Sequence, residues 1–232
     1  MTPEIYLETL KKACGGNLQS FVLYGSTAAG DAIAGKSDCN VMLLLKDASL
    51  SELRVIAAAS RDWLKKGNPP PLIFTPEQFG SSADTFPIEL ADMKEFHVVL
   101  YGDDPLPALN INPADLRLAV ERELKGKLIQ LHGAYLALAG SSRPLPGLMT
   151  GSLSQVLVLC RAALRLRAAS VPGSKLACAA QLREHVEFDA EVFAVVHALR
   201  SGKAADGDEE ALFGRYLGAI EKLSAAIDGW GN

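Results

Sequence analysis

The sequence has few residues that could form a disulfide framework or a metal-binding cluster. Its 232 residues include four cysteines and four histidines, and none of them stands in a CxxC pair or at a metal-ligand spacing. The wide separation of the cysteines predicts reduced, mostly buried thiols. We expect ordinary surface or core positions for the histidines, which are His97, His132, His185 and His197.

An excess of basic residues is also absent. Lys and Arg total 23 against 27 Asp and Glu, and the formal net charge is -4. Binding to duplex nucleic acid depends on a field of cationic side chains. The composition therefore predicts no duplex nucleic acid as a partner and favours a small molecule or another protein.

The N-terminal stretch lacks the basic region and apolar core of a signal peptide, and no apolar run approaches the length that we expect of a membrane span. We therefore predict a cytoplasmic protein without a membrane partner. Hydrophobic residues make up 49% of the chain and no segment is of low complexity, which is typical of a globular protein with a core.

The first half of the chain alternates between strand and helix patterns. Helices are predicted at 2–14, 50–66 and 75–83, where capping residues precede apolar positions at helical spacing. Short apolar runs predict strands at 18–24, 39–45, 71–74 and 97–102. This alternation ends at residue 102.

The second half has a different character. A connector rich in Pro and Asp follows residue 102, and Asn112 with Pro113 is a typical start for a long helix. Apolar residues recur there at spacings of three and four, and four further segments show similar faces separated by Gly or Pro. The sequence thus predicts an α+β protein with an α/β domain at 1–104 and an all-α helical bundle at 110–232.

The segment from 24 to 45 carries the residues with the clearest chemical role. A strand delivers Gly25 and Ser26, and the next strand begins after Ser37 and Asp38. Glycine lets a backbone approach a phosphate, and a hydroxyl with nearby backbone N–H groups donates hydrogen bonds to phosphate oxygens. Asp38 is the candidate ligand for a divalent ion. This pattern predicts a nucleoside triphosphate site.

The same residues resemble the nucleotidyltransferase superfamily, which has the DNA polymerase beta-like fold. Its pattern is Gly-Ser or Gly-Gly, then after about ten residues two acids that flank one apolar residue on a strand. Gly25, Ser26, Asp38 and Cys39 fit this pattern. The resemblance implies a mixed sheet with flanking helices, and Mg²⁺ as cofactor.

Asn40 departs from the pattern, because it occupies the position of the family's second acid. Residues two apart on a strand point to the same face, so Asp38 and residue 40 would both reach the metals while Cys39 enters the core. Two magnesium ions need concentrated negative charge. Asn40 offers a single neutral oxygen, which predicts a degenerate active site.

The family's third acid comes from a later strand, but the predicted strand at 71–74 contains no carboxylate. Glu89 and Asp92 are the nearest alternatives, and the segment that holds them resembles FPIE-like segments of bacterial relatives in this group. We rank Glu89 first. A solvated position at the end of an element is the more ordinary interpretation of either acid.

The helical second half resembles that of the bacterial aminoglycoside nucleotidyltransferases, whose acceptors bind between the two halves. Three interpretations follow. One is a catalytically impaired protein that binds a nucleoside triphosphate and an acceptor. The others are an active Mg²⁺-dependent transferase acting on a small-molecule or protein hydroxyl, and a non-catalytic module that binds a protein partner.

Overall fold

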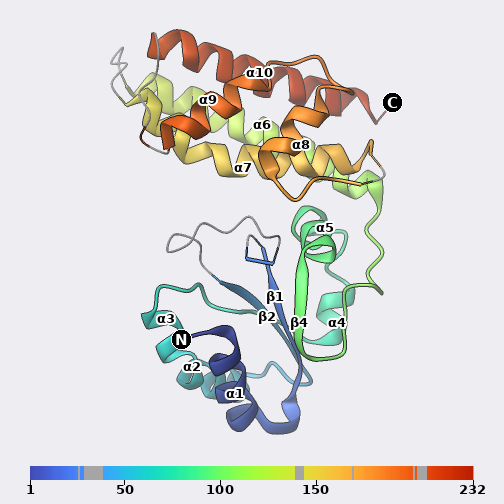
Figure 1. The fold of residues 1–232 in the computed structure, drawn as a ribbon. Coiled ribbons are helices and arrows are strands. Elements are labelled where there is room, and N and C mark those ends of the chain that lie inside the picture. Colours follow the sequence, from blue (N-terminus) through green and yellow to red (C-terminus); the bar gives the residue numbers. More distant parts are fainter. Residues whose placement is uncertain are drawn as a thin grey trace. The chain divides into compact units, whose positions relative to one another are not determined.

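The computed structural model describes residues 1–25, 27–28, 39–138, 144–168, 170–200, 202 and 208–231. The chain divides into two compact units, Met1–Asn112 and Pro113–Asn232, which are coloured blue to green and green to red in Figure 1. The first unit combines a sheet with helices. The second is helical throughout its described part.

The first unit follows the predicted alternation of strands and helices. Its elements are α1 (Pro3–Cys14), the 3₁₀ turn η1 (Gly15–Asn17), β1 (Leu18–Tyr24), β2 (Asn40–Leu45), α2 (Leu50–Ala59), α3 (Arg61–Lys65), β3 (Leu72–Phe74), α4 (Pro76–Gly80), α5 (Pro87–Glu95) and β4 (His97–Gly102). The predicted capping box is confirmed at the start of α4, where the Gln78 backbone N–H donates to Thr75 Oγ1 at 3.2 Å.

Residues 50–66, which we predicted as one helix, form two. The buried Ser60 separates them, and its hydroxyl donates to the carbonyl of Ile56 at 2.7 Å. Because that hydroxyl has a single proton, the Tyr6 hydroxyl is the donor in the 2.6 Å hydrogen bond between Tyr6 and Ser60. A serine that bonds back to the preceding turn bends a helix, which explains the break.

The sheet has four strands in the order β3-β2-β1-β4. β1 runs antiparallel to both β2 and β4, and β2 runs parallel to β3. Figure 1 shows α1, α2 and α3 on one face of this sheet and α4 and α5 on the other. This mixed sheet between helices, followed by a helical unit, confirms the predicted α+β class.

Each face of the sheet carries its own apolar core. Tyr6, Phe21 and Trp63 are central to the first core, where the rings of Tyr6 and Trp63 stack at 4.7 Å. Val22 and Met42 are central to the second, which α4 and α5 cover. The sheet is therefore packed between two apolar cores.

The predicted connector packs along the first unit. Leu106 and Leu109 are buried in the second core, and Lys94 Nζ donates to the carbonyls of Pro107 and Leu109 at 3.3 and 2.5 Å. The boundary between the two compact units lies after Asn112. The connector belongs to the first unit because burial of the two leucine side chains in its core removes apolar surface from water.

The second unit is a bundle of long and short helices. Its elements are α6 (Pro113–Ala137), α7 (Leu145–Arg165), α8 (Lys175–Leu182), α9 (Glu191–Arg200) and α10 (Glu209–Gly229). α7 contacts each of the other four. Inside this core the hydroxyls of Ser152 and Tyr216 hydrogen bond at 2.9 Å, and Arg161 donates to the carbonyl of Gly173 at 3.1 Å.

Helix α7 is long and apolar enough to cross a membrane by length and hydropathy alone, although we expected no such segment. Of its most apolar 18-residue window, 61% is buried inside the structure. This is the burial of a central core helix. The predicted state of the cysteines is confirmed, since all four are free, three are buried and Cys39 is half-buried.

Candidate functional site

Gly25 and Asn40 come together where β1 ends and β2 begins. Gly25 has a φ of +82°, a conformation that glycine adopts without strain. A β-carbon placed on residue 25 would lie 3.1 Å from Nδ2 of Asn40. The two positions singled out in the sequence are therefore in contact.

Three residues form a row across the strand ends at this edge. Tyr24 on β1 pairs with Asn40 on β2 and with His97 on β4. Paired residues of neighbouring strands project from the same face of a sheet. Asn40, Tyr24 and His97 therefore share one face, which is the face of the second core, since Tyr24 packs against it.

Cys39 takes the opposite face, as the alternation along the strand predicts, and packs against the first core. Its backbone N–H donates to Oδ1 of Asn68 at 3.2 Å, and Asn68 Nδ2 donates to the carbonyl of Trp63 at 3.4 Å. Trp63 is fully buried. The backbone directly after Asp38 is thereby anchored to the first core.

Asp38, Ser26 and Ser37 lie outside the described residues. Their roles as metal ligand and phosphate-binding residues remain predictions from the sequence. The described part of the site is thus the end of β1 with Gly25, the start of β2 with Cys39 and Asn40, and the neighbouring end of β4.

Glu89 lies on α5 and its side chain is exposed. The helix buries Ile88, Leu90 and Met93 against the first unit, so Glu89 points away from that packed face. It stands in the first turn, where a carboxylate is favoured by the helix dipole. Asp92, on the same helix, is half-buried. Both acids lie on a helix, whereas the third acid of the nucleotidyltransferase pattern lies on a strand.

His97 is the residue at this edge that our sequence interpretation missed. Its Nε2 lies 3.0 Å from Oδ2 of Asp104, and the other oxygen of Asp104 accepts from the backbone N–H of Leu106 at 3.0 Å. The His97 side chain is 16% exposed, and its buried Nδ1 has no hydrogen-bond partner among the residues that the structure describes. No local spacing links His97 to Asp104, so the sequence contained no signal for this pair.

The chemistry of this pair follows from its partner. An ionised carboxylate accepts hydrogen bonds only, so the proton of the His97 ring is on Nε2 when the ring is neutral. Nδ1 is then an acceptor to which no group in the described part of the chain donates. A buried acceptor of this kind costs free energy until a hydroxyl or water reaches it.

Tyr24 stands between Asn40 and His97 in the row. Burial raises the pKa of its hydroxyl to about 12, because the phenolate would lose hydration. The side chain is therefore neutral near pH 7 and can donate a hydrogen bond at the strand ends.

The described residues do not fit a two-magnesium site. They contain no group of three His, Cys, Asp or Glu side chains arranged to hold a metal ion. At the strand ends they offer the neutral amide of Asn40, whereas magnesium is bound through carboxylates and phosphate oxygens.

No family model matches the sequence, and no curated protein matches it. Among solved structures, the fold is similar to that of spectinomycin adenyltransferase AAD(9) from an Enterococcus species, solved with ATP and spectinomycin. The TM-score is 0.61 at 13% sequence identity, over 97% of this chain and 98% of that chain. At this identity the comparison establishes the fold, which is that of the nucleotidyltransferases with a helical domain.

Proposed function

We propose that this protein binds a nucleoside triphosphate beside Gly25 and that its capacity for nucleotidyl transfer is impaired. The observation that carries the proposal is the contact between Gly25 and Asn40 at the strand ends. The fold and the glycine support a nucleotide site. The amide in place of a carboxylate supports the loss of catalytic power.

Phosphate binding rests on the backbone after β1. The positive φ of Gly25 turns the chain sharply and leaves no side chain between the backbone and a ligand. Ser26 and Ser37 would add hydroxyl donors to the phosphate oxygens. The solved structure with the similar fold contains ATP, which is consistent with this assignment.

Impairment rests on the missing negative charge. Nucleotidyl transfer joins an acceptor hydroxyl oxygen to the α-phosphorus, breaks the bond to pyrophosphate and releases the hydroxyl proton. Asp38 would be the main magnesium ligand, and Asn40 would contribute one neutral oxygen. The exposed Glu89 would have to supply the remaining carboxylate. A site with so little negative charge would bind magnesium weakly, and nucleotidyl transfer would be slow.

A small molecule with a hydroxyl is the acceptor that we propose, because the similar structure was solved with spectinomycin and ATP. The composition also favours a small molecule over nucleic acid, because a net charge of -4 gives no positive electrostatic field that would attract phosphates. A protein partner is the alternative if no nucleotide binds.

Thermal unfolding with nucleotides tests the proposal. ATP, GTP, CTP or UTP with magnesium should raise the Tm, because a ligand at a hundred times its Kd adds about 2.7 kcal/mol to stability. The rise should disappear in Gly25→Ala. It should persist in Gly16→Ala, whose added methyl has no neighbour within 4 Å.

Two results would contradict the proposal in different ways. No rise in Tm with any of the four nucleotides would favour the protein-binding module. Pyrophosphate release at enzymatic rates, with ATP and a panel of aminocyclitols, would instead show an active transferase with a rearranged set of acids.

A further inference from the structure

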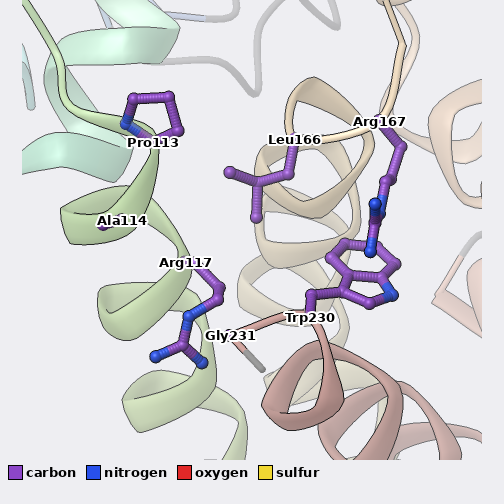
Figure 2. Close-up of a pocket in the computed structure, with 7 residues that line it drawn as sticks. All are labelled: Pro113, Ala114, Arg117, Leu166, Arg167, Trp230 and Gly231. Carbon is purple, nitrogen blue, oxygen red and sulfur yellow. The ribbon is translucent and has the colours of Figure 1, made fainter.

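The second unit contains a pocket of about 400 Å³ at one end of its bundle. Three helix ends form it, as Figure 2 shows: the start of α6, the end of α7 and the end of α10. The lining includes Pro113, Arg117, Leu166, Arg167, Trp230 and Gly231. None of the lining side chains that the structure describes is acidic.

Arg167 supplies a positive charge at the edge of this pocket. Figure 2 shows Arg167 beside the ring of Trp230. The guanidinium carbon lies over this ring, 4.2 Å from its centroid. No carboxylate pairs with Arg167 within the part of the chain that the structure describes. A guanidinium over an aromatic ring has no hydrogen-bond acceptor in the ring for all of its five N–H donors, so donors remain that can bind an anion.

Arg117 is held differently. Its Nη1 donates to Oε2 of Glu121 at 2.6 Å and lies 3.4 Å from the carbonyl of Ile227. A β-carbon on Gly231 would come within 2.9 Å of the Arg117 guanidinium carbon, so the chain passes directly over it. Glu121 also accepts from Lys125, whose Nζ lies 3.3 Å from Oδ2 of Asp228, so two carboxylates balance Arg117 and Lys125. Arg167 is the lining cation that no carboxylate of the described residues pairs with.

The remaining wall is apolar. Leu166 extends from the end of α7 toward α6 in Figure 2, and Pro113 and the Trp230 ring complete the lining. Pockets of this size hold small organic ligands, with apolar walls for the body and a few polar groups that fix orientation. Here one fixed cation sets the charge of the ligand that matches.

We infer that this pocket binds a small aromatic carboxylate. The planar apolar body lies against Leu166, Pro113 and the edge of Trp230, and the carboxylate accepts hydrogen bonds from Arg167. A monoanion matches a single uncommitted guanidinium, whereas a phosphate monoester would bring a second negative charge without a partner. This site is independent of the nucleotide proposed for the first unit.

Tryptophan fluorescence can test the inference with benzoate as the probe. Trp230 is half-buried at the pocket, whereas the other tryptophan of the sequence, Trp63, is fully buried in the first unit. Benzoate should change the emission with a Kd on the order of millimolar, as expected for so small a ligand. Trp230→Phe should abolish the response. Benzyl alcohol, benzylamine and phenyl phosphate should each bind at least about tenfold more weakly.

The role of Arg167 is tested by Arg167→Gln, which should weaken benzoate binding by about tenfold or more, as for a lost hydrogen bond to a charged group. Arg122→Gln is the matched control, because Arg122 is 70% exposed, pairs with Glu123 and does not line the pocket. The nucleotide-dependent rise in Tm should survive in Arg167→Gln, which separates the two sites.

The inference is overturned if benzoate does not bind the unmodified protein, or if benzyl alcohol binds as tightly. Equal affinity in the parent and Arg167→Gln would also overturn it. The selectivity among the four probes needs no variant, so the test holds even if a substitution at Arg167 disturbs folding.

Discussion

The amide of Asn40 packs against the backbone of Gly25, with only 3.1 Å between its Nδ2 and the place where a β-carbon on residue 25 would stand. This contact joins the end of β1, where Gly25 follows, to the start of β2. Any side chain at residue 25 would displace residue 40. The contact therefore couples the stability of the strand ends to the geometry of the candidate site.

Alanine substitutions at three glycines with positive φ should show how much stability is lost to backbone strain and how much to steric contact. Gly67→Ala adds a methyl in open space and should cost about 1 kcal/mol for the φ of +85° alone. Gly25→Ala should cost about 1–2 kcal/mol, because Asn40 must also move. Gly102→Ala should cost more than about 3 kcal/mol, since its β-carbon would lie 1.8 Å from the carbonyl oxygen of Gln19.

Urea denaturation of the three variants measures this order. Equal losses at all three positions would show that the backbone conformation alone decides the cost. A small loss for Gly102→Ala would mean that β1 and β4 separate easily at that end.

Asn40→Asp should change stability in opposite directions with and without metal. In EDTA the variant should melt below the parent, because Asp38 and the new carboxylate would be like charges on one strand face. With magnesium and nucleotide it should show the larger gain in Tm. Calorimetric scans under both conditions make the comparison.

The control for this experiment is Asn40→Ser, which removes the amide without adding charge and should show no larger gain than the parent. The deficit of Asn40→Asp in EDTA should also vanish as the pH falls below about 4. Repulsion raises the pKa of one carboxyl in the folded variant above its pKa in the unfolded chain. Below about pH 4 that carboxyl is protonated in both the folded and the unfolded variant, so the loss of stability disappears. Equal gains in the parent and Asn40→Asp would place residue 40 away from the metal.

Two substitutions of His97 should have unequal effects. Glutamine keeps a donor near the position of Nε2 for Asp104 and removes Nδ1, which has no hydrogen-bond partner among the described residues. The free energy of unfolding of His97→Gln should therefore lie within about 0.5 kcal/mol of that of the parent. Asparagine matches Nδ1 instead and leaves Asp104 without its side-chain partner, so His97→Asn should lose about 1–2 kcal/mol. Urea midpoints compare the pair. The opposite order would mean that Nδ1, and not the bond to Asp104, stabilises this edge.

Tyr24 should make the protein less stable at high pH. Its pKa is about 12 in the folded protein and 10.0 in the reference state, so the unfolded chain loses the proton first. The stabilising contribution is complete below pH 10 and declines as the pH rises toward 12, by on the order of 2 kcal/mol. Tyr24→Phe should remove this part of the decline. Free energies of unfolding at pH 8 and pH 11 for both proteins give the measurement.

The order of elements in the first unit follows from local patterns in the sequence. Apolar runs of strand length predict β1 and β2, and the capping residues Thr75 and Gln78 mark α4. These signals are legible because periodicity, capping and turn residues act between neighbours in the chain. α5 was not foreseen, and its buried residues show a weak helical pattern beside the exposed Glu89.

Functional residues divide in the same way. The chain positions of Gly25 and Asn40 follow from a pattern within one segment, and the sequence by itself determined that residue 40 carries an amide and not a carboxylate. Only the tertiary structure decided that Asn40 touches Gly25, that His97 stands in one row with Tyr24 and Asn40 and bonds to Asp104, and that Arg167 lies over Trp230. Each of these relations depends on strand register or on helix packing between distant segments. Local sequence specifies the elements, but register and packing set which side chains meet, because both are determined by burial across the whole unit.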